Sequence, residues 1–183
     1  MVAQDRRVRK TRAVLKQSLI ALMKEKSINH ITVKELCEKS DINRGTFYLH
    51  YRDVFDLFEQ VEMEFFNNLK EVLDESKKDI VSLKDTHLEP MFRFILDNNA
   101  FCLVMLSEHG DLSFTRQLFK YIYDRVIQIY GKESAAIEHC YFFIVYGCVG
   151  LILNWLNTGA KESPAEMASL AENIILNGIA KYL

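Results

Sequence analysis

The chain has 183 residues, of which 49% are apolar, and carries a net charge of −2 at pH 7. This length and apolar content allow a substantial core in one large domain or two small ones. The four cysteines form no Cys-x-x-Cys pair and lie in apolar helical patterns, which indicates reduced thiols in a cytoplasmic protein rather than disulfides or a metal site. Basic residues open the chain without an apolar run after them, so we expect no secretory signal peptide.

Charge is divided unevenly along the chain. Residues 1–52 hold 12 Lys and Arg against 5 Asp and Glu, a net charge of +7, whereas residues 53–183 hold 11 against 20, a net charge of −9. A solvated charged face does not explain why the positive charge is confined to one end. The division predicts a basic domain at 1–52 that meets a polyanion, and an acidic domain at 53–183 that does not.

Helical periodicity dominates, and glycine and proline are scarce at seven and two residues, so we predict an all-α fold of about nine helices. The predicted helices cover residues 6–26, 33–40, 44–51, 53–77, 87–98, 100–108, 112–130, 135–157 and 164–182. Start signals open three of them, at Thr32 with Glu35, at Asp53, and at Ser163 with Glu166. Basic side chains crowd the first two turns of the first helix, where they oppose the helix dipole unless phosphates offset that cost.

Two short helices joined by a tight turn, after a longer supporting helix, form the pattern of a helix-turn-helix unit. The second helix of such a unit enters the major groove, so its first turn needs small or polar side chains. Here that turn reads Asn43-Arg44-Gly45-Thr46. Arg44 can bind guanine O6 and N7 together, Gly45 allows close backbone approach, and Thr46 can reach a phosphate or a thymine methyl. The pattern predicts binding to double-stranded operator DNA.

The run from Thr32 to Tyr51, TVKELCEKSDINRGTFYLHY, resembles the DNA-binding signature of the TetR family, and the likeness extends over about residues 12–58. More weakly, residues 106–164 resemble the C-terminal domain of family members from Gram-positive bacteria (Firmicutes). The resemblance implies an N-terminal three-helix helix-turn-helix domain followed by a helical dimerisation and effector domain. It further implies DNA contacts from Thr32, Asn43, Arg44, Gly45, Thr46, Tyr48 and His50.

The function that this resemblance implies is sequence-specific regulation of transcription, by a cytoplasmic homodimeric repressor that a small-molecule effector releases. A transcriptional activator, or a regulator of the same fold that responds to a partner protein, is the alternative. An enzyme is not expected, because the sequence has no glycine-rich phosphate loop, GxSxG or HExxH motif. We expect no cofactor and no metal site, since the consecutive residues of Glu138-His139-Cys140 diverge on a helix.

The last two predicted helices form the expected dimer interface, because small and apolar side chains share one face of each. The predicted interface residues are Gly147, Gly150, Leu151, Asn154, Met167, Leu170, Ile174 and Gly178. An apolar effector cavity is expected among aromatic and methionine side chains, although most of these side chains suit an ordinary core equally well. The candidate cavity residues are Phe65, Met91, Met105, Tyr123 and Tyr146.

A stretch of 21 uncharged residues, from Cys140 to Ala160, is long enough to span a bilayer. It contains Asn154 and Asn157, and no basic cluster flanks it. We therefore expect a central helix of a soluble assembly and no membrane, with a spanning helix as the alternative.

One residue departs from the family pattern: Val54 stands where a lysine often contacts a phosphate. We expect Val54 to pack beneath the second short helix, because valine at an exposed helix start has little to favour it. The basic cluster at residues 6–12 is then the expected source of the missing phosphate contact.

Overall fold

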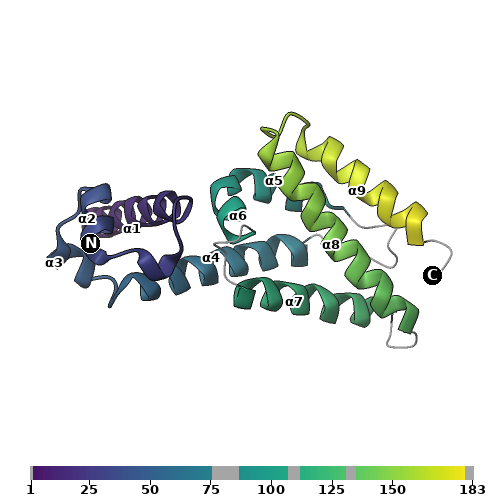
Figure 1. The fold of residues 1–183 in the computed structure, drawn as a ribbon, viewed down its shortest axis with the longest axis horizontal. Coiled ribbons are helices and arrows are strands. Elements are labelled where there is room, and N and C mark those ends of the chain that lie inside the picture. Colours follow the sequence, from purple (N-terminus) through teal and green to yellow (C-terminus); the bar gives the residue numbers. More distant parts are fainter. Residues whose placement is uncertain (1, 76–86, 107–111, 131–134, 180–183) are drawn as a thin grey trace. The chain divides into compact units, whose positions relative to one another are not determined.

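The computed structural model describes residues 2–75, 87–106, 112–130 and 135–179 (Figure 1). These residues contain nine α-helices and one short 3-10 helix and no strand, which confirms the predicted all-α class. The helices are α1 (Val2–Met23), η1 (Ile28–His30), α2 (Val33–Ser40), α3 (Arg44–Tyr48), α4 (Val54–Glu75), α5 (Glu89–Asp97), α6 (Asn99–Met105), α7 (Leu112–Tyr130), α8 (Ala135–Asn157) and α9 (Pro164–Ile179). The described residues fall into two compact units, an N-terminal unit (2–65) and a C-terminal unit (66–179), which divide inside α4.

The N-terminal unit is built around side chains that are fully buried. Leu15 and Leu19 of α1, Leu36 of α2, Phe47 of α3 and Leu57 of α4 each have 0% of their surface exposed. Each helix therefore contributes its apolar face to one shared core, with α1 packed directly against α2 (Figure 1). Burying side chains of this size contributes about 1.5–3 kcal/mol each.

Side-chain caps define the helix boundaries in this unit. Thr32 Oγ1 accepts a hydrogen bond from the N–H of Glu35 at 3.2 Å, which opens α2. Asp53 Oδ1 accepts from the N–H of Asp56 at 2.8 Å and opens α4 in the same way. Both caps satisfy helix donors that have no partner within the helix, and both were predicted from the sequence.

The region from residue 43 to residue 52 differs from the prediction at the end of its helix. α3 ends at Tyr48 rather than at residue 51, because the N–H of His50 turns back to Phe47 O at 2.9 Å. The N–H of Tyr51 bonds the same carbonyl at 3.0 Å, so one further helical turn follows the regular helix. Shared acceptors of this kind are common where helices end.

The C-terminal unit has its own aromatic core. The ring of Phe92 in α5 meets Trp155 of α8 edge to face at 5.7 Å, and both side chains are almost fully buried. The indole N–H of Trp155 donates to Glu162 O at 3.0 Å, which satisfies the buried donor. α9 packs along α5, and the backbone N–H of Leu88 just before α5 donates to Glu172 of α9 at 2.8 Å.

α9 begins with the predicted capping box. Glu166 N–H donates to Ser163 Oγ at 3.3 Å, and the backbone N–H of Ser163 donates to the Glu166 carboxylate at 2.7 Å. These bonds from the backbone and hydroxyl of Ser163 lower the pKa of Glu166. Pro164 follows at the first helical position, where a backbone N–H would have no partner within the helix, so its missing donor costs no helix bond.

α8 carries the long uncharged stretch. By length and composition, residues Glu138–Asn157 could cross a membrane, and 28% of the tested segment is buried within the protomer. One such helix is weak evidence for a span, because the central helix of a soluble protein has the same character.

Candidate nucleic-acid interface

α3 and the helical turn that follows it have an inner and an outer face, set by the four-residue spacing of their side chains. Phe47 and Tyr51 point inward: they are 0% and 6% exposed, and their rings lie 5.7 Å apart. Arg44 and Tyr48 lie on the opposite side, and Tyr48 is 57% exposed. The inner aromatics hold the short helix on the core, so that an arginine and a tyrosine face solvent.

The start of α3 is rigid and open. Asn43 caps the helix by accepting a hydrogen bond from the N–H of Gly45 at 2.7 Å. A Cβ at residue 45 would lie 3.2 Å from that same amide oxygen, so glycine leaves room for the cap as well as for a close neighbour. Because the cap fixes Asn43, the exposed Arg44 next to it projects from a well-defined helix end.

The remaining predicted DNA-contact residues differ in their surroundings. Thr32 is exposed, but its hydroxyl already caps α2. Thr46 and His50 are half-buried, and the His50 ring lies 6.2 Å from that of Tyr51. Leu49, which the sequence reading did not single out, is 80% exposed at the end of α3 and can contact a thymine methyl.

The glutamate at the third position of α2 is held in its charged form. The Glu35 carboxylate accepts from Lys26 Nζ at 2.7 Å, and this bond is the main cause that lowers the pKa of Glu35. A bond from the backbone N–H of Thr32 adds to the effect. The second half of the Thr32–Glu35 capping box is therefore present, and an ion pair to the segment after α1 stabilises it.

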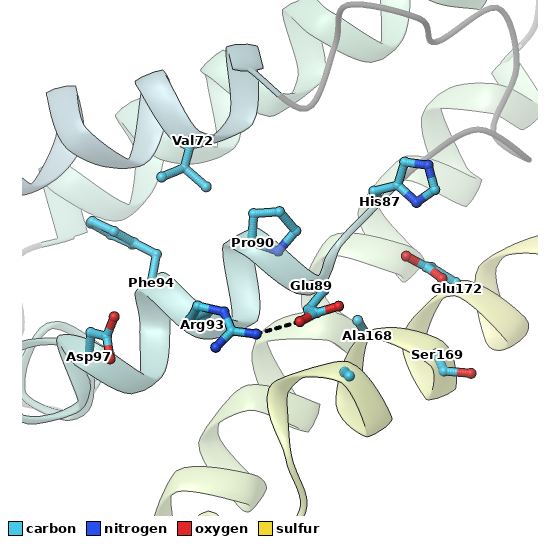
Figure 2. A pocket seen from close by; sticks show the side chains of 11 residues that line it. Val72, His87, Glu89, Pro90, Arg93, Phe94, Asp97, Ala168, Ser169 and Glu172 are labelled. Carbon is cyan, nitrogen blue, oxygen red and sulfur yellow. Dashed lines mark hydrogen bonds and ion pairs between the residues drawn. The ribbon is translucent and has the colours of Figure 1, made fainter.

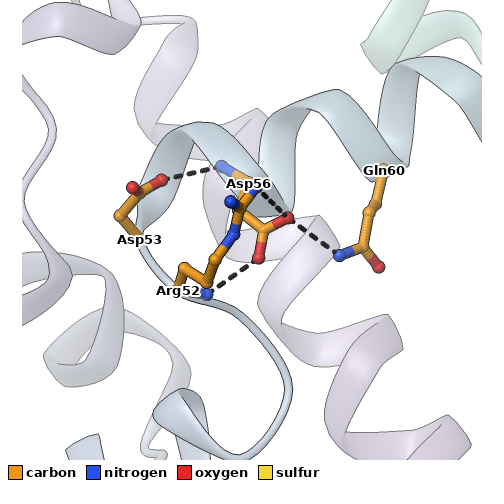
Figure 3. A network of polar contacts seen from close by, with 4 residues as sticks. All are labelled: Arg52, Asp53, Asp56 and Gln60. Carbon is orange, nitrogen blue, oxygen red and sulfur yellow. Dashed lines mark hydrogen bonds and ion pairs between the residues drawn. The ribbon is translucent and has the colours of Figure 1, made fainter.

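The start of α4 holds a polar network that sequence reasoning missed (Figure 3). Asp56 accepts from the backbone N–H of Arg52 at 2.8 Å, from Arg52 Nη2 at 3.4 Å and from Gln60 Nε2 at 3.2 Å. These bonds, led by the one from the backbone of Arg52, lower the pKa of Asp56. The four-residue spacing of Arg52 and Asp56 is the signal that could have revealed the pair.

Val54 lies inside the N-terminal unit, with 4% of its surface exposed. Its burial agrees with the expected packing role and places its side chain away from solvent. The basic residues at the start of α1 lie on the surface instead: Arg6, Arg7, Lys10 and Arg12 are exposed.

The C-terminal unit exposes an apolar surface along α8 and α9. Phe143 and Tyr146 of α8 are 76% and 62% exposed, and Leu170 and Ile174 of α9 are 46% and 55% exposed. Of the predicted interface residues, Gly147, Gly150, Asn154 and Gly178 are exposed and Leu151 is half-buried. A Cβ would meet nothing within 4 Å at any of these three glycines, so a second backbone could approach there. Met167 differs: it is 4% exposed and already covered within the protomer.

The five candidate effector-cavity residues do not share one environment. Phe65 and Met105 are buried, Met91 and Tyr123 are half-buried, and Tyr146 is exposed. Tyr123 packs edge to face with Tyr141 at 5.0 Å, whereas Tyr146 packs against Phe119 at 5.3 Å.

A cavity of about 650 Å³ lies elsewhere in the C-terminal unit, among the ends of α4, α5 and α9 (Figure 2). Its wall mixes apolar and charged side chains, and the Arg93–Glu89 ion pair at 2.5 Å crosses one side. The lining residues are Val72, His87, Glu89, Pro90, Arg93, Phe94, Asp97, Ala165, Ala168, Ser169 and Glu172.

Comparison with known proteins gives both a family and a fold. A family model described as the transcriptional regulator C-terminal region (TetR_C_8) matches residues 84–177, just over half of the chain. YxbF from Bacillus subtilis, an uncharacterized HTH-type transcriptional regulator, is 31% identical over 163 residues. That match covers 83% of this chain but 41% of YxbF, so the chain spans less than half the length of this relative.

Solved structures share the fold at low identity. The fatty acid degradation regulator FadR from Bacillus halodurans superposes with a TM-score of 0.70 at 10% identity, covering 92% of this chain and 96% of its own. FadR from Bacillus subtilis, solved in complex with stearoyl-CoA, gives a TM-score of 0.64 at 11% identity, covering 91% and 98%.

A capped pair of short helices within residues 1–52, which carry a net charge of +7, followed by a helical C-terminal unit, is the arrangement of a helix-turn-helix regulator. The chain belongs to the TetR family of transcriptional regulators, as the match over its C-terminal half shows.

Proposed function

We propose that the protein is a homodimer that binds a specific operator through α3 and controls transcription from it. The observation that carries the proposal is the two-sided α3, in which buried Phe47 and Tyr51 hold exposed Arg44 and Tyr48 outward at a capped helix start. The net charge of +7 over residues 1–52 supports the same conclusion, since phosphates are the natural partner of a basic surface.

The residues have separate roles in this proposal. Arg44 reads a base, because an exposed guanidinium at the first turn of the second helix can bind guanine O6 and N7 together. Tyr48 and His50 donate to phosphates beside the groove, and Thr46 contacts a phosphate or a thymine methyl. Asn43 and Thr32 act through their caps, which hold the two short helices in register, and Gly45 leaves space at the groove.

The dimer forms through α8 and α9. Four large apolar side chains there are between 46% and 76% exposed in the single protomer, namely Phe143, Tyr146, Leu170 and Ile174. An exposed surface of this kind marks an interaction site, and the open glycines of α8 permit close helix packing. Two copies present two α3 helices, as a two-fold operator requires.

We further propose that the protein is a cytoplasmic, non-enzymatic repressor, and that an apolar effector releases it from DNA. FadR from Bacillus subtilis was solved with stearoyl-CoA, so a protein of this fold binds a ligand that has a long apolar acyl chain. Met91, Met105 and Tyr123 of the C-terminal unit remain candidates to line such a site, whereas Tyr146 belongs to the exposed surface assigned to the dimer and Phe65 belongs to the N-terminal unit. Calorimetric titration of the dimer with acyl-CoA tests this part; a protein that binds none of a chain-length series needs a different effector.

The DNA-binding part is tested with a mobility-shift titration on the duplex upstream of the protein's own gene. Arg44→Ala should weaken binding by about 1–3 kcal/mol and relax preference at one position in each half-site. Lys120→Ala is the matched control, because Lys120 is an exposed cation of α7 in the C-terminal unit. Equal affinity and equal sequence preference for Arg44→Ala and wild type would refute the role of Arg44.

A reporter fused to that promoter decides the sign of regulation. Deleting the gene should raise the signal of a repressed promoter, and adding the effector to the intact strain should raise it too. A signal that falls on deletion would instead identify the protein as an activator.

A further inference from the structure

We propose that Arg52 makes the phosphate contact that Val54 cannot make, and that Asp56 positions its guanidinium for this contact. The inference rests on the proposed function, since it concerns the same DNA-binding surface. It assigns the contact to the start of α4 rather than to the basic cluster of α1.

Carboxylates already accept hydrogen bonds from two backbone N–H groups around the start of α4. Asp53 accepts a hydrogen bond from the N–H of Asp56, and Asp56 in turn accepts one from the N–H of Arg52. The free N–H groups that make a helix start attractive to anions are therefore already used in part. With Val54 buried, an anion near this end needs a cation that reaches outward.

Arg52 is that cation, because it lies in the short link between α3 and α4 with a side chain that is 82% exposed. Phe47 and Tyr51 are buried four residues apart, and the bond from Tyr51 N–H to Phe47 O continues the helical turn between them. Arg44 and Tyr48 are exposed with the same four-residue spacing on the other side. Arg52 lies beyond the end of α3, directly before the Asp53 cap of α4, and its backbone N–H donates forward to Asp56.

Asp56 holds Arg52 without covering it. The carboxylate is turned inward, with 14% of its side chain exposed, and its short bond is to the backbone of Arg52. The contact to Nη2 is longer, at 3.4 Å (Figure 3), and the Arg52 side chain remains 82% exposed, so other guanidinium donors are left for solvent. A planar guanidinium has five donors, and a single long bond to Asp56 leaves the others for phosphate oxygens.

The test measures DNA affinity at several salt concentrations. It uses two duplexes: a mixed-sequence duplex of about 30 base pairs and the duplex upstream of the protein's own gene. Arg52→Gln should lower the slope of log affinity against log salt by about 0.9 per subunit and weaken binding roughly tenfold per subunit at 0.1 M salt. Arg52→Lys keeps the charge and should keep the slope. Lys120→Gln, which removes a cation paired with Asp124 in the C-terminal unit, should change nothing.

Four outcomes separate the two proposals. A wild-type protein that binds neither duplex overturns the proposed function itself. Wild-type binding with an unchanged slope for Arg52→Gln overturns the role of Arg52, and a slope that falls for Arg9→Gln with Lys10→Gln but not for Arg52→Gln returns the contact to α1. A loss of affinity in Arg52→Gln that accompanies a lower melting temperature, without a change of slope, shows a structural role and also overturns the inference.

Discussion

The two compact units expose opposite kinds of surface. In the N-terminal unit the aromatic side chains Phe47 and Tyr51 are buried, whereas the cations Arg44 and Arg52 are exposed. In the C-terminal unit Phe143 remains 76% exposed on a helix without charge between Cys140 and Ala160. The first surface suits a partner that carries charge, and the second suits a partner that removes apolar area from water.

The two units differ in how much of their apolar surface they bury within a single protomer. In the N-terminal unit, side-chain caps open α2, α3 and α4 and the large side chains of the core are buried, so we expect this unit to fold without a partner. The exposed aromatics of α8 offer area that a second copy can bury, so stability of the C-terminal unit should depend on protein concentration. Four substitutions and one pH series test this difference between the two units.

The largest expected effect comes from the core of the N-terminal unit. Phe47→Ala removes a ring that is 0% exposed and should cost about 3–5 kcal/mol of unfolding free energy. The single tryptophan, Trp155, lies in the C-terminal unit, so its fluorescence reports that unit while circular dichroism reports both. Circular dichroism should show early melting that fluorescence does not.

Phe55→Ala is the matched control for this substitution, because Phe55 in the same unit is 47% exposed and should matter much less. If both spectroscopic signals shift together in Phe47→Ala, the two units unfold as one and the contrast between them fails.

The dimer surface gives the next effect. Ile174→Glu places a charge on an exposed apolar position of α9 and should weaken the dimer by about 3 kcal/mol, more than a hundredfold in dissociation constant. Sedimentation equilibrium measures the change, and Ser169→Glu, on another side of the helix, serves as the control. A dimer of undiminished affinity in Ile174→Glu would place the interface elsewhere.

Val54→Lys tests whether the start of α4 belongs to the core or to the DNA surface. Val54 is 4% exposed, so a lysine must extend its ammonium out of the core at a cost of about 2 kcal/mol in stability. Circular dichroism melts should show the loss, and the salt slope of DNA binding should stay unchanged. A steeper slope with unchanged melting would show that residue 54 faces a phosphate after all.

The cap of α4 should contribute less. Asp53→Ala removes the acceptor for the N–H of Asp56 and should lower stability by about 1 kcal/mol. Asp53→Asn keeps an acceptor and should recover most of the loss in denaturant titration. Equal stability of Asp53→Ala and wild type would mean that water replaces the cap at no cost.

The smallest effect is the acid sensitivity of the capping box in the C-terminal unit. The pKa of Glu166 is lowered in the folded protein, so its contribution is present above the ordinary glutamate pKa, near 4.3, and is lost as pH falls through the lower folded value. Glu166→Gln should flatten the fall of melting temperature with pH in that range. An unchanged acid profile in the variant would assign the sensitivity to other carboxylates.

The sequence by itself determined the helices and the helix-turn-helix, because their signals are local. Thr32, Asp53 and Ser163 each cap a helix where the sequence predicted one, since a side-chain acceptor bonds an N–H two or three residues away. The spacing of apolar residues likewise predicted the inner faces, and the signature from Thr32 to Tyr51 indicated the family. These features need no knowledge of distant contacts.

Only the tertiary structure decided which side chains remain for partners. Met167 was expected at the dimer surface beside Ile174, yet it is buried while Ile174 is exposed, because α9 also packs along α5. The cavity of about 650 Å³ is likewise made by residues from α4, α5 and α9 that are far apart in the chain. The role proposed for Arg52 depends on the burial of the Val54 and Asp56 side chains, which the sequence does not show. Burial depends on what packs from elsewhere in the chain, and local patterns carry no such information.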